Sequence, residues 1–241
     1  MRFPKITRFK LPAVLALLFL VLTACDEVAF PRDPDGTLDR VEATGRVRVA
    51  AVDHRPWVIW DGRRSPGGAE VRLVGAFARE LGATVEWRRA SAFDTLEALK
   101  RGDVDLAVGG FTREEITVHG GAASTYVYFT EALVVAARPG GPMPAELDGE
   151  EVVSPLDRMT DTLIEDAGGV PIAREAAAAS LVALPDWEIP AHGLVPTGIE
   201  LHRSEHVMAV PRGENAWVDR LERFLRKNAH RLDDMLREEA S

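Results

Sequence analysis

The chain has 241 residues, of which 29 are Lys or Arg and 38 are Asp or Glu, giving a formal net charge of −9. This acidic balance argues against nucleic-acid binding, which requires a basic surface. With 46% hydrophobic and 28% charged residues, the composition is that of a folded globular protein and not of a disordered one. The single cysteine excludes an intramolecular disulfide and a cysteine-based metal cluster.

Met1–Ala24 has the pattern of a secretory signal peptide. Four basic side chains precede the apolar run Leu11–Leu22, and small residues lead up to Cys25. The run is too short to span a bilayer as a helix, which takes about 20 apolar residues. Leu22-Thr23-Ala24-Cys25 also resembles the lipobox of bacterial lipoproteins, in which the cysteine carries a diacylglycerol and becomes the first mature residue. The alternative is an ordinary signal peptide with an incidental cysteine.

A tether is expected at 25–44, because Asp26–Thr44 is rich in Pro, Asp and Gly and shows no periodicity. Strands and helices then alternate. We expect strands at Arg46–Val52, Thr84–Arg88 and Val104–Gly109, and helices at Val71–Leu81 and from the capping residue Ser91 to Lys100. This alternation predicts an α/β fold with a mostly parallel sheet and helices on both faces.

The second half of the chain shows fewer clear signals. We expect strands at Leu133–Ala137, Glu151–Val153 and His206–Val210, and helices at Thr160–Asp166 and Arg174–Leu184. Asn215 is expected to cap a helix whose apolar stripe consists of Trp217, Leu221, Phe224 and Leu225. Leu232–Leu236 is expected to continue in helix.

The order of these segments resembles the extracellular solute-binding proteins of family 3, which feed amino acids and similar solutes to ABC importers. The resemblance is good over Gly45–Ala137 and poor from Pro142 to Ser204. The stretches that carry it are Gly45–Ala50 followed by Pro56-Trp57, Gly68-Ala69-Glu70-Val71 leading into Phe77–Gly82, and Arg101–Leu106 leading to Gly109-Gly110-Phe111-Thr112.

The resemblance implies a two-lobed type 2 periplasmic-binding-protein fold with a reduced second lobe. Lobe 1 would be 45–138 plus 205–241 and lobe 2 would be 139–204, with hinges near Ala136–Pro139 and Glu205–Met208. It also implies a monomer without cofactor or enzymatic activity. Such a protein would capture a small polar solute for an ABC permease, in the periplasm or at the cell surface, anchored to the membrane by acyl chains on Cys25.

Ligands of such folds meet the loops at the carboxyl ends of the strands. Asp53 and Trp57 follow the first strand. Asp53 either pairs with a cationic ligand group or is a solvated turn residue, and Trp57 either stacks on a ligand or covers the sheet edge. Gly110 and Thr112 follow the third strand and offer N–H groups and a hydroxyl to an anion. Tyr126 corresponds to a tyrosine of the family, or is a core residue.

One departure from the family pattern concerns the ligand. Amino-acid binders carry an arginine a few residues after the threonine, which clamps the ligand carboxylate as a bidentate fork. In this chain Glu115 or Thr117 stands in that register, and Arg113 is the only arginine nearby. Because an acidic residue repels a carboxylate, the sequence argues against a standard amino-acid ligand.

The second lobe offers three candidate residues. Asp186 stands in for the aspartate that often holds a ligand amine in the family. Asp157 and Thr160 flank the start of a short helix, where family members bind a carboxylate through backbone N–H groups. The alternative for Asp157 is a simple helix N-cap.

Metal and catalytic motifs are weak. His202 and His206 are four residues apart, but their segment is strand-like and no third ligand is evident, so no metal site is expected. The sequence has no G-x-S-x-G, P-loop or H-E-x-x-H motif.

A solute receptor is therefore the leading function. A regulatory or sensory lipoprotein without an uptake role is the second. An enzyme similar to the periplasmic cyclohexadienyl dehydratases is the third, and it requires a buried acid with a raised pKa.

Overall fold

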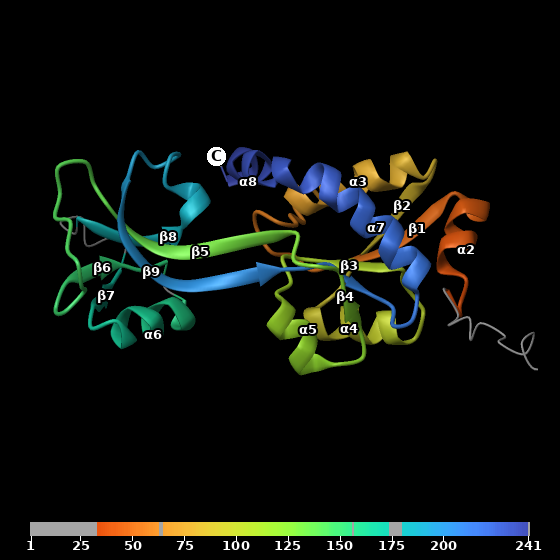
Figure 1. The fold of residues 1–241 in the computed structure, drawn as a ribbon, viewed down its shortest axis with the longest axis horizontal. Coiled ribbons are helices and arrows are strands. Elements are labelled where there is room, and N and C mark those ends of the chain that lie inside the picture. The colour runs from red at the N-terminus through yellow and green to blue at the C-terminus, as the bar shows by residue number, and fades with distance from the viewer. Residues whose placement is uncertain (1–32, 63–64, 156, 174–179, 241) are drawn as a thin grey trace, which may run out of the picture. The chain divides into compact units, whose positions relative to one another are not determined.

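The computed structural model describes residues 33–62, 65–155, 157–173 and 180–240 (Figure 1). Cys25, the signal-like segment and the first part of the expected tether lie outside these residues. Within the described ranges, no helix combines the length and the apolar character needed to cross a membrane.

The first sheet has five strands in the order β2-β1-β3-β10-β4. β1 is parallel to β2 and β3, and β10 is antiparallel to β3 and β4. The strands are β1 (Arg46–Ala51), β2 (Thr84–Arg89), β3 (Leu106–Val108), β4 (Ala123–Ser124) and β10 (Ala209–Val210). The parallel β-α-β-α-β start of the fold is thus confirmed.

Helices cover both faces of the first sheet (Figure 1). On one face lie α3 (Ala69–Glu80), α7 (Asn215–Asn228) and α8 (Leu232–Ala240), and on the other lie α4 (Ala92–Lys100) and α5 (Arg113–His119). The alternation of β1 explains the two cores: Val47 and Val49 pack with the first group, whereas Ala50 packs with the second.

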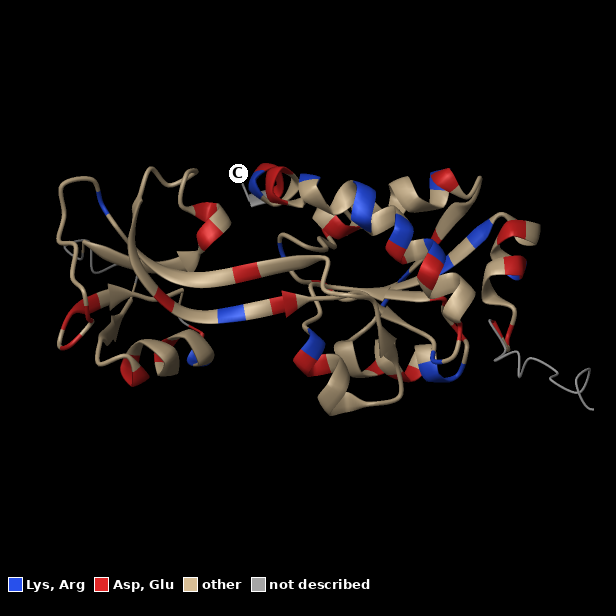
Figure 2. Ribbon diagram, viewed as in Figure 1, with Lys and Arg blue, Asp and Glu red and all other residues tan. Residues whose placement is uncertain are grey.

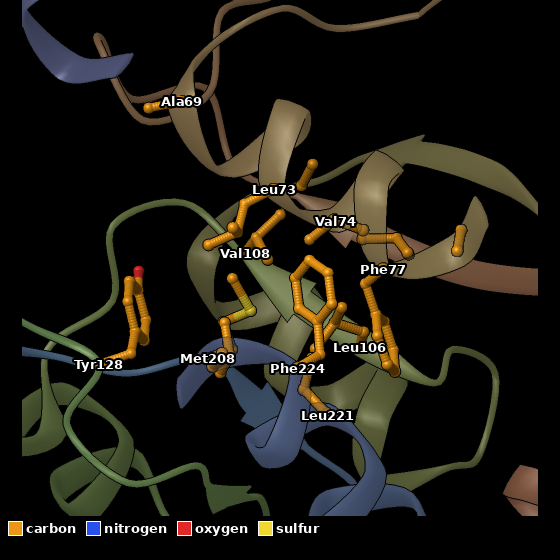
Figure 3. Packing of buried hydrophobic residues seen from close by; sticks show 14 of the residues in the cluster. Ala69, Leu73, Val74, Phe77, Leu106, Val108, Tyr128, Met208, Leu221 and Phe224 are labelled. Atoms are coloured by element: carbon orange, nitrogen blue, oxygen red, sulfur yellow. The ribbon is translucent and has the colours of Figure 1, made fainter. Parts of the chain in front are cut away.

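The main core contains the predicted stripe of α7. Trp217, Leu221, Phe224 and Leu225 are all buried there, and the Phe77 ring of α3 lies 5.3 Å from the rings of both Trp217 and Phe224. Figure 3 shows how Phe77, Leu106, Met208 and Phe224 converge from different segments. Asn215 is the first residue of α7 and makes no capping hydrogen bond, because Glu214 holds the N-cap position.

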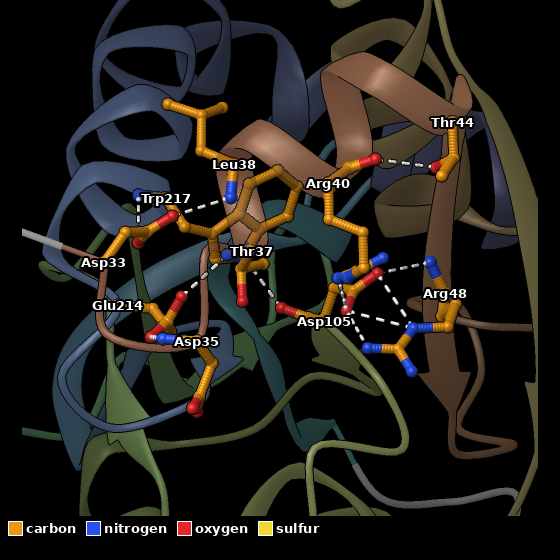
Figure 4. A network of polar contacts seen from close by, with 10 residues as sticks. All are labelled: Asp33, Asp35, Thr37, Leu38, Arg40, Thr44, Arg48, Asp105, Glu214 and Trp217. Atoms are coloured by element: carbon orange, nitrogen blue, oxygen red, sulfur yellow. Dashed lines mark hydrogen bonds and ion pairs between the residues drawn. The ribbon is translucent and has the colours of Figure 1, made fainter.

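The expected tether is wrong from Thr37 onward, because α2 (Thr37–Thr44) packs on the first sheet. Val41 is completely buried in the main core. The Glu214 carboxylate accepts hydrogen bonds from the backbone N–H groups of Asp35 and Thr37, both at 2.9 Å (Figure 4). Tertiary contacts therefore order a segment whose local sequence indicates a loop.

The second sheet has the order β7-β6-β8-β5-β9. β5 is antiparallel to β8 and β9, and β6 is parallel to β7 and β8. The elements are β5 (Phe129–Ala137), β6 (Glu151–Val153), α6 (Arg158–Asp166), β7 (Val170–Ile172), β8 (Leu181–Pro185), the 3-10 turn η1 (Asp186–Glu188) and β9 (Val195–His206). A small core of Val135, Leu147, Val152, Ile164 and Leu181 packs the sheet against α6.

Two predictions fail in this half. The helix expected at Arg174–Leu184 is wrong at its end, because Leu181–Pro185 is strand β8, and residues 174–179 lie outside the described ranges. The long strand β9 was not predicted. It contains Pro196 and Gly198, which disfavour strands, and it lies at a sheet edge where both are tolerated.

The chain passes from the first sheet to the second between Ser124 and Phe129 and returns between His206 and Ala209. The first crossing therefore precedes the position expected near Ala136–Pro139. The apolar run Leu133–Ala137 is the end of a nine-residue strand, and its polar start was not recognised.

Candidate functional site

A buried carboxylate, Glu70, supports the loop that follows β3. The side chain of Glu70 is fully buried, and its Oε2 accepts hydrogen bonds from the N–H groups of Gly109 (2.7 Å) and Gly110 (2.8 Å). The Tyr128 hydroxyl donates to Oε1. Burial raises the pKa of Glu70, and these three hydrogen bonds oppose that rise.

Close packing above this loop depends on glycine. Gly110 has a φ of 68°, and a Cβ there would lie 2.7 Å from Cδ1 of Trp57. The Trp57 ring is only 3% exposed and stacks on the His206 ring, with centroids 4.2 Å apart and planes 28° apart. The Phe129 ring approaches the Trp57 ring edge-on, with centroids 5.6 Å apart. The loop after β1 and the end of β9 are thereby locked together.

His206 has a defined protonation state. Its Nδ1 lies 3.0 Å from the carbonyl oxygen of Gly110, which can only accept, so Nδ1 carries the proton. Burial lowers the pKa of His206 to about 4, and the ring is neutral at pH 7. Its Nε2 is then a bare acceptor, and it has no hydrogen-bond partner among the described residues.

Glu131 of β5 faces this bare nitrogen. Its Oε1 lies 4.0 Å from Nε2 of His206, and its Oε2 accepts a hydrogen bond of 2.7 Å from the Trp187 indole N–H. Burial raises the pKa of Glu131, and the nearby Asp186 charge adds to the rise. Two acceptors thus face each other at a distance that a shared donor group between them would satisfy.

The loop donors that an anionic ligand would use are already occupied. Thr112 caps α5 and forms a capping box with Glu115: Glu115 Oε2 accepts from the Thr112 N–H at 2.8 Å, and the Thr112 side chain accepts from the Glu115 N–H at 3.2 Å. Together with Glu70, the chain's own carboxylates take the N–H groups of Gly109, Gly110 and Thr112. This site, called the candidate solute site below, comprises the loop Gly109–Thr112 with Glu70, Glu131 and His206.

The model of the bacterial extracellular solute-binding proteins, family 3, matches residues 47–232. The chain belongs to this family. The match confirms the family that the motifs around Gly45–Thr112 indicate, and the two mixed sheets with their helices are a two-lobed type 2 periplasmic-binding-protein fold with a reduced second lobe.

Solved structures of the family confirm the fold. An ancestral cationic amino acid solute binding protein aligns with a TM-score of 0.64 at 17% identity, covering 84% of this chain and 98% of that one. A polar amino acid ABC uptake transporter substrate binding protein from Streptococcus thermophilus aligns with a TM-score of 0.62 at 12% identity, covering 84% and 88%. At such identities the likeness concerns the fold alone.

Curated relatives in sequence include larger proteins. A membrane-bound lytic murein transglycosylase F of Vibrio cholerae serotype O1 is 30% identical over 122 residues, which are 50% of this chain and 22% of that protein. A protein of the same description from Maricaulis maris is 35% identical over 138 residues, 56% of this chain and 30% of that one. The matched region thus spans less than a third of these relatives.

Only part of the predicted first-lobe set of this family member comes together. Gly110 and Thr112 lie in the candidate solute site, and the Trp57 ring is buried and stacks on His206 in this structure. Asp53 is exposed and pairs with Arg89 at 2.7 Å. Arg113 is also exposed and pairs with Glu205 at 3.3 Å.

Tyr126 lies elsewhere in the first lobe. Its ring is covered by Arg226 of α7 at 5.1 Å, and its backbone N–H donates to Glu222 at 2.7 Å. The residue packs beside the main core, as its alternative interpretation expects. Tyr128, two residues further along, donates to Glu70, and Glu70 in turn holds the loop after β3.

The second-lobe residues act locally in this structure. Asp157 is the N-cap of α6 and accepts from both the N–H (2.8 Å) and the hydroxyl (2.7 Å) of Thr160, which is buried. Asp186 begins η1 and accepts from the Trp187 N–H at 3.0 Å. Asp186 also reaches β5: it accepts from the Ala132 N–H at 3.4 Å, and its charge raises the pKa of Glu131.

Sequence reasoning missed Glu70, Glu131 and a structural role for His206. Glu70 lies within the Gly68–Val71 motif, and asking which groups pair with its carboxylate would have identified it as a site residue. His206 was considered only as a metal ligand with His202. Within the described part of the chain, no group of three His, Cys, Asp or Glu side chains is arranged to hold a metal.

Proposed function

We propose that this family member is a receptor that captures a small polar solute at the candidate solute site and delivers it to an ABC permease. In the proposal a lipid on Cys25 keeps it at a membrane, on the periplasmic or outer side, as a monomer. The observation that carries the proposal is the match of the family 3 solute-binding model to residues 47–232, and the two-lobed fold also covers 98% of a cationic amino acid solute binding protein. The Streptococcus thermophilus neighbour is described as part of a polar amino acid ABC uptake transporter.

The chemistry of the site favours a solute with a donor group. The N–H groups of Gly109, Gly110 and Thr112 already serve internal carboxylates, so a ligand carboxylate gains little there. The facing acceptors on Glu131 and His206 instead favour an ammonium or guanidinium group. The proposed solute is therefore cationic, such as a basic amino acid or a polyamine.

A thermal-shift panel of arginine, lysine, polyamines, dicarboxylates and sugars tests this function. A cationic solute at a hundred times its dissociation constant should add about 2.7 kcal/mol of stability and raise Tm. Glu131→Gln should abolish the shift, because it removes the charge that faces His206. Glu146→Gln, an exposed carboxylate in the same lobe, is the matched control and should retain it. The proposal fails if no solute raises Tm, or if Glu131→Gln responds like the parent protein.

A regulatory role is the second candidate, and the curated relatives favour it. Membrane-bound lytic murein transglycosylases contain a region of this sequence type as less than a third of their length. Such a domain would sense a cell-wall fragment and have no permease partner. A thermal shift with soluble peptidoglycan fragments, and none with cationic solutes, would favour this candidate.

We propose no enzymatic role. Glu70, the fully buried acid of the site, is engaged through both carboxylate oxygens with three donors. A catalytic acid must reach substrate with its proton.

A further inference from the structure

A pocket lies at the opposite end of the strands from the candidate solute site. Its volume is about 440 Å³, within the range of about 300–1,000 Å³ typical of small-molecule sites. Arg48 of β1 and Asp105, directly before β3, form its inner wall, and residues from α2, the end of α4 and the segment after β10 surround them. The pocket is called the basic pocket below.

Basic side chains dominate the lining of this pocket although acidic residues exceed basic ones over the whole chain. Five lining residues are basic and two are acidic, whereas acidic and basic residues are interspersed along the ribbon as a whole (Figure 2). The basic ones are Arg40, Arg48, Lys100, Arg101 and Arg212, and the acidic ones are Asp35 and Asp105. A local excess of positive charge therefore surrounds a cavity in an otherwise acidic protein.

In the inner wall, Asp105 holds a preorganised pair of guanidinium groups. Asp105 is completely buried, and it forms ion pairs with both Arg40 and Arg48, the latter at 2.6 Å (Figure 4). The two arginine side chains remain 33% and 35% exposed. One carboxylate cannot neutralise two guanidinium groups, so a positive charge remains on groups whose positions are already fixed.

The basic residues outside the inner wall, Lys100, Arg101 and Arg212, are available to a ligand. Arg212 is exposed; its Nε donates to the Ala122 carbonyl at 3.1 Å, and no ion pair of Arg212 with a carboxylate is found among the described residues. Within the described ranges, Arg101 pairs only with the exposed Asp103 at 2.9 Å, and Lys100 only with Glu97 at 3.6 Å. Exposed pairs of this kind contribute about 0–1 kcal/mol, so a ligand with a higher charge can replace them.

We propose that the basic pocket binds an anionic phosphate ester. A phosphate monoester carries a charge of about −1.5 to −2 at pH 7 and presents three acceptor oxygens, which matches several converging cations better than one carboxylate does. Guanidinium groups bind such oxygens as bidentate forks. The site is separate from the candidate solute site and does not depend on the proposed uptake function.

Two sources present this chemical group: a soluble phosphate ester and an anionic lipid headgroup. Asp35 in the pocket lining is ten residues from Cys25. If Cys25 carries the proposed anchor, a fully extended chain of that length keeps Asp35 within about 35 Å of the bilayer. A headgroup can then reach the pocket, and the experiment must separate the two sources.

Calorimetric titration of the purified protein with glycerol 3-phosphate tests the site. We expect saturable binding that weakens with added salt. Arg212→Gln should weaken it about tenfold or more, because a charged donor is lost while the buried Asp105 pairs stay intact. Arg223→Gln on α7, which removes the same charge from an exposed i,i+4 pair, is the matched control and should bind normally. Absence of saturable binding, an unaffected Arg212→Gln variant, or equal binding of succinate would each overturn the proposal.

Vesicles identify the source. Cosedimentation uses vesicles of about one part phosphatidylglycerol to three parts phosphatidylcholine, and phosphatidylcholine vesicles alone as the blank. Binding that glycerol 3-phosphate competes away and that Arg212→Gln loses assigns a lipid headgroup. Titration with glycerol 3-phosphate but no such vesicle binding assigns a soluble ester. Vesicle binding that Arg212→Gln retains, with no titration by glycerol 3-phosphate, contradicts the pocket.

Discussion

At the residue scale, His206 joins the loop after β3 to the strand that returns from the second lobe. Its Nδ1 is bound to the Gly110 carbonyl, its ring stacks on Trp57, and its Nε2 faces Glu131. A buried neutral imidazole resists protonation, since a charge there is poorly solvated. The protonation state of one residue is thus tied to the stability of the candidate solute site.

The pKa of His206 makes a signed prediction about stability. The folded-state pKa of about 4 lies below the ordinary value of 6.5, so the unfolded chain binds the proton first as pH falls. This histidine therefore destabilises the fold progressively between pH 6.5 and 4, by about 3 kcal/mol at the lower end. Glu131 and Glu70, whose pKa values are raised, act in the opposite direction.

Comparison with His206→Gln isolates the histidine. Glutamine keeps a donor for the Gly110 carbonyl and does not titrate. The free energy of unfolding, measured by urea denaturation, is compared as the value for the parent protein minus the value for the variant. This difference should fall by about 3 kcal/mol from pH 7 to pH 4. A difference that stays constant over this pH range would mean that His206 is not held neutral by the fold.

At the element scale, the sequence predicts best where local signals and tertiary packing agree. β1, α3, β2 and α4 have clear periodicity and recognisable ends, such as the Ser91 cap of α4. β8 and α2 were not predicted, because their local signals and their tertiary packing disagree. Leu181–Pro185 follows an alanine-rich stretch that favours helix, and α2 follows a segment rich in loop formers, yet both are ordered by long-range contacts.

The same distinction between local signals and long-range packing explains how much of the candidate solute site the sequence predicts. The sequence places Gly110 and Thr112 in the loop after β3 because they follow a buried strand. It cannot show that Trp57 packs inward on His206, because these residues are far apart in the chain and meet only through the fold. Glu115 was recognised as an obstacle to a ligand carboxylate, but its capping box with Thr112 needs side-chain geometry.

Glu214 should be the residue that holds α2 to the first lobe. Its carboxylate accepts from two backbone N–H groups at the start of the helix, and these hydrogen bonds lower its pKa although burial opposes them. Glu214→Ala leaves both donors without their partner, and we expect a loss of about 2 kcal/mol in the free energy of unfolding.

Hydrogen exchange locates this effect. In Glu214→Ala the amides of Thr37–Thr44 should exchange faster, while those of the second sheet should keep their protection. Glu222→Ala is the control on the same helix, since Glu222 accepts from Tyr126 and not from α2. Unchanged exchange in α2 would show that contacts other than Glu214, such as Val41 packing and the Arg40–Asp105 ion pair, hold the helix.

At the scale of the whole molecule, the two lobes share more than the strands β5 and β9. Trp187 belongs to the second lobe by sequence, yet its side chain is 4% exposed and packs with the core cluster of the first lobe. Arg237 of α8 donates to the Trp187 carbonyl at 3.2 Å, and the indole N–H donates to Glu131. One residue, through its indole and its backbone carbonyl, therefore connects the second lobe, the candidate solute site and the C-terminal helix.

This connection predicts cooperative unfolding. With Trp187 in place, calorimetry should show a single transition, because opening one lobe exposes part of the other lobe's core. Trp187→Ala should cost about 3–5 kcal/mol and separate the transition into two, with the reduced second lobe melting first because its core is small. Trp60→Ala removes a half-buried indole within the first lobe, and it should lower Tm without splitting the transition. Two transitions in the unsubstituted protein would contradict the coupling, because lobes whose unfolding is linked through Trp187 melt in one transition.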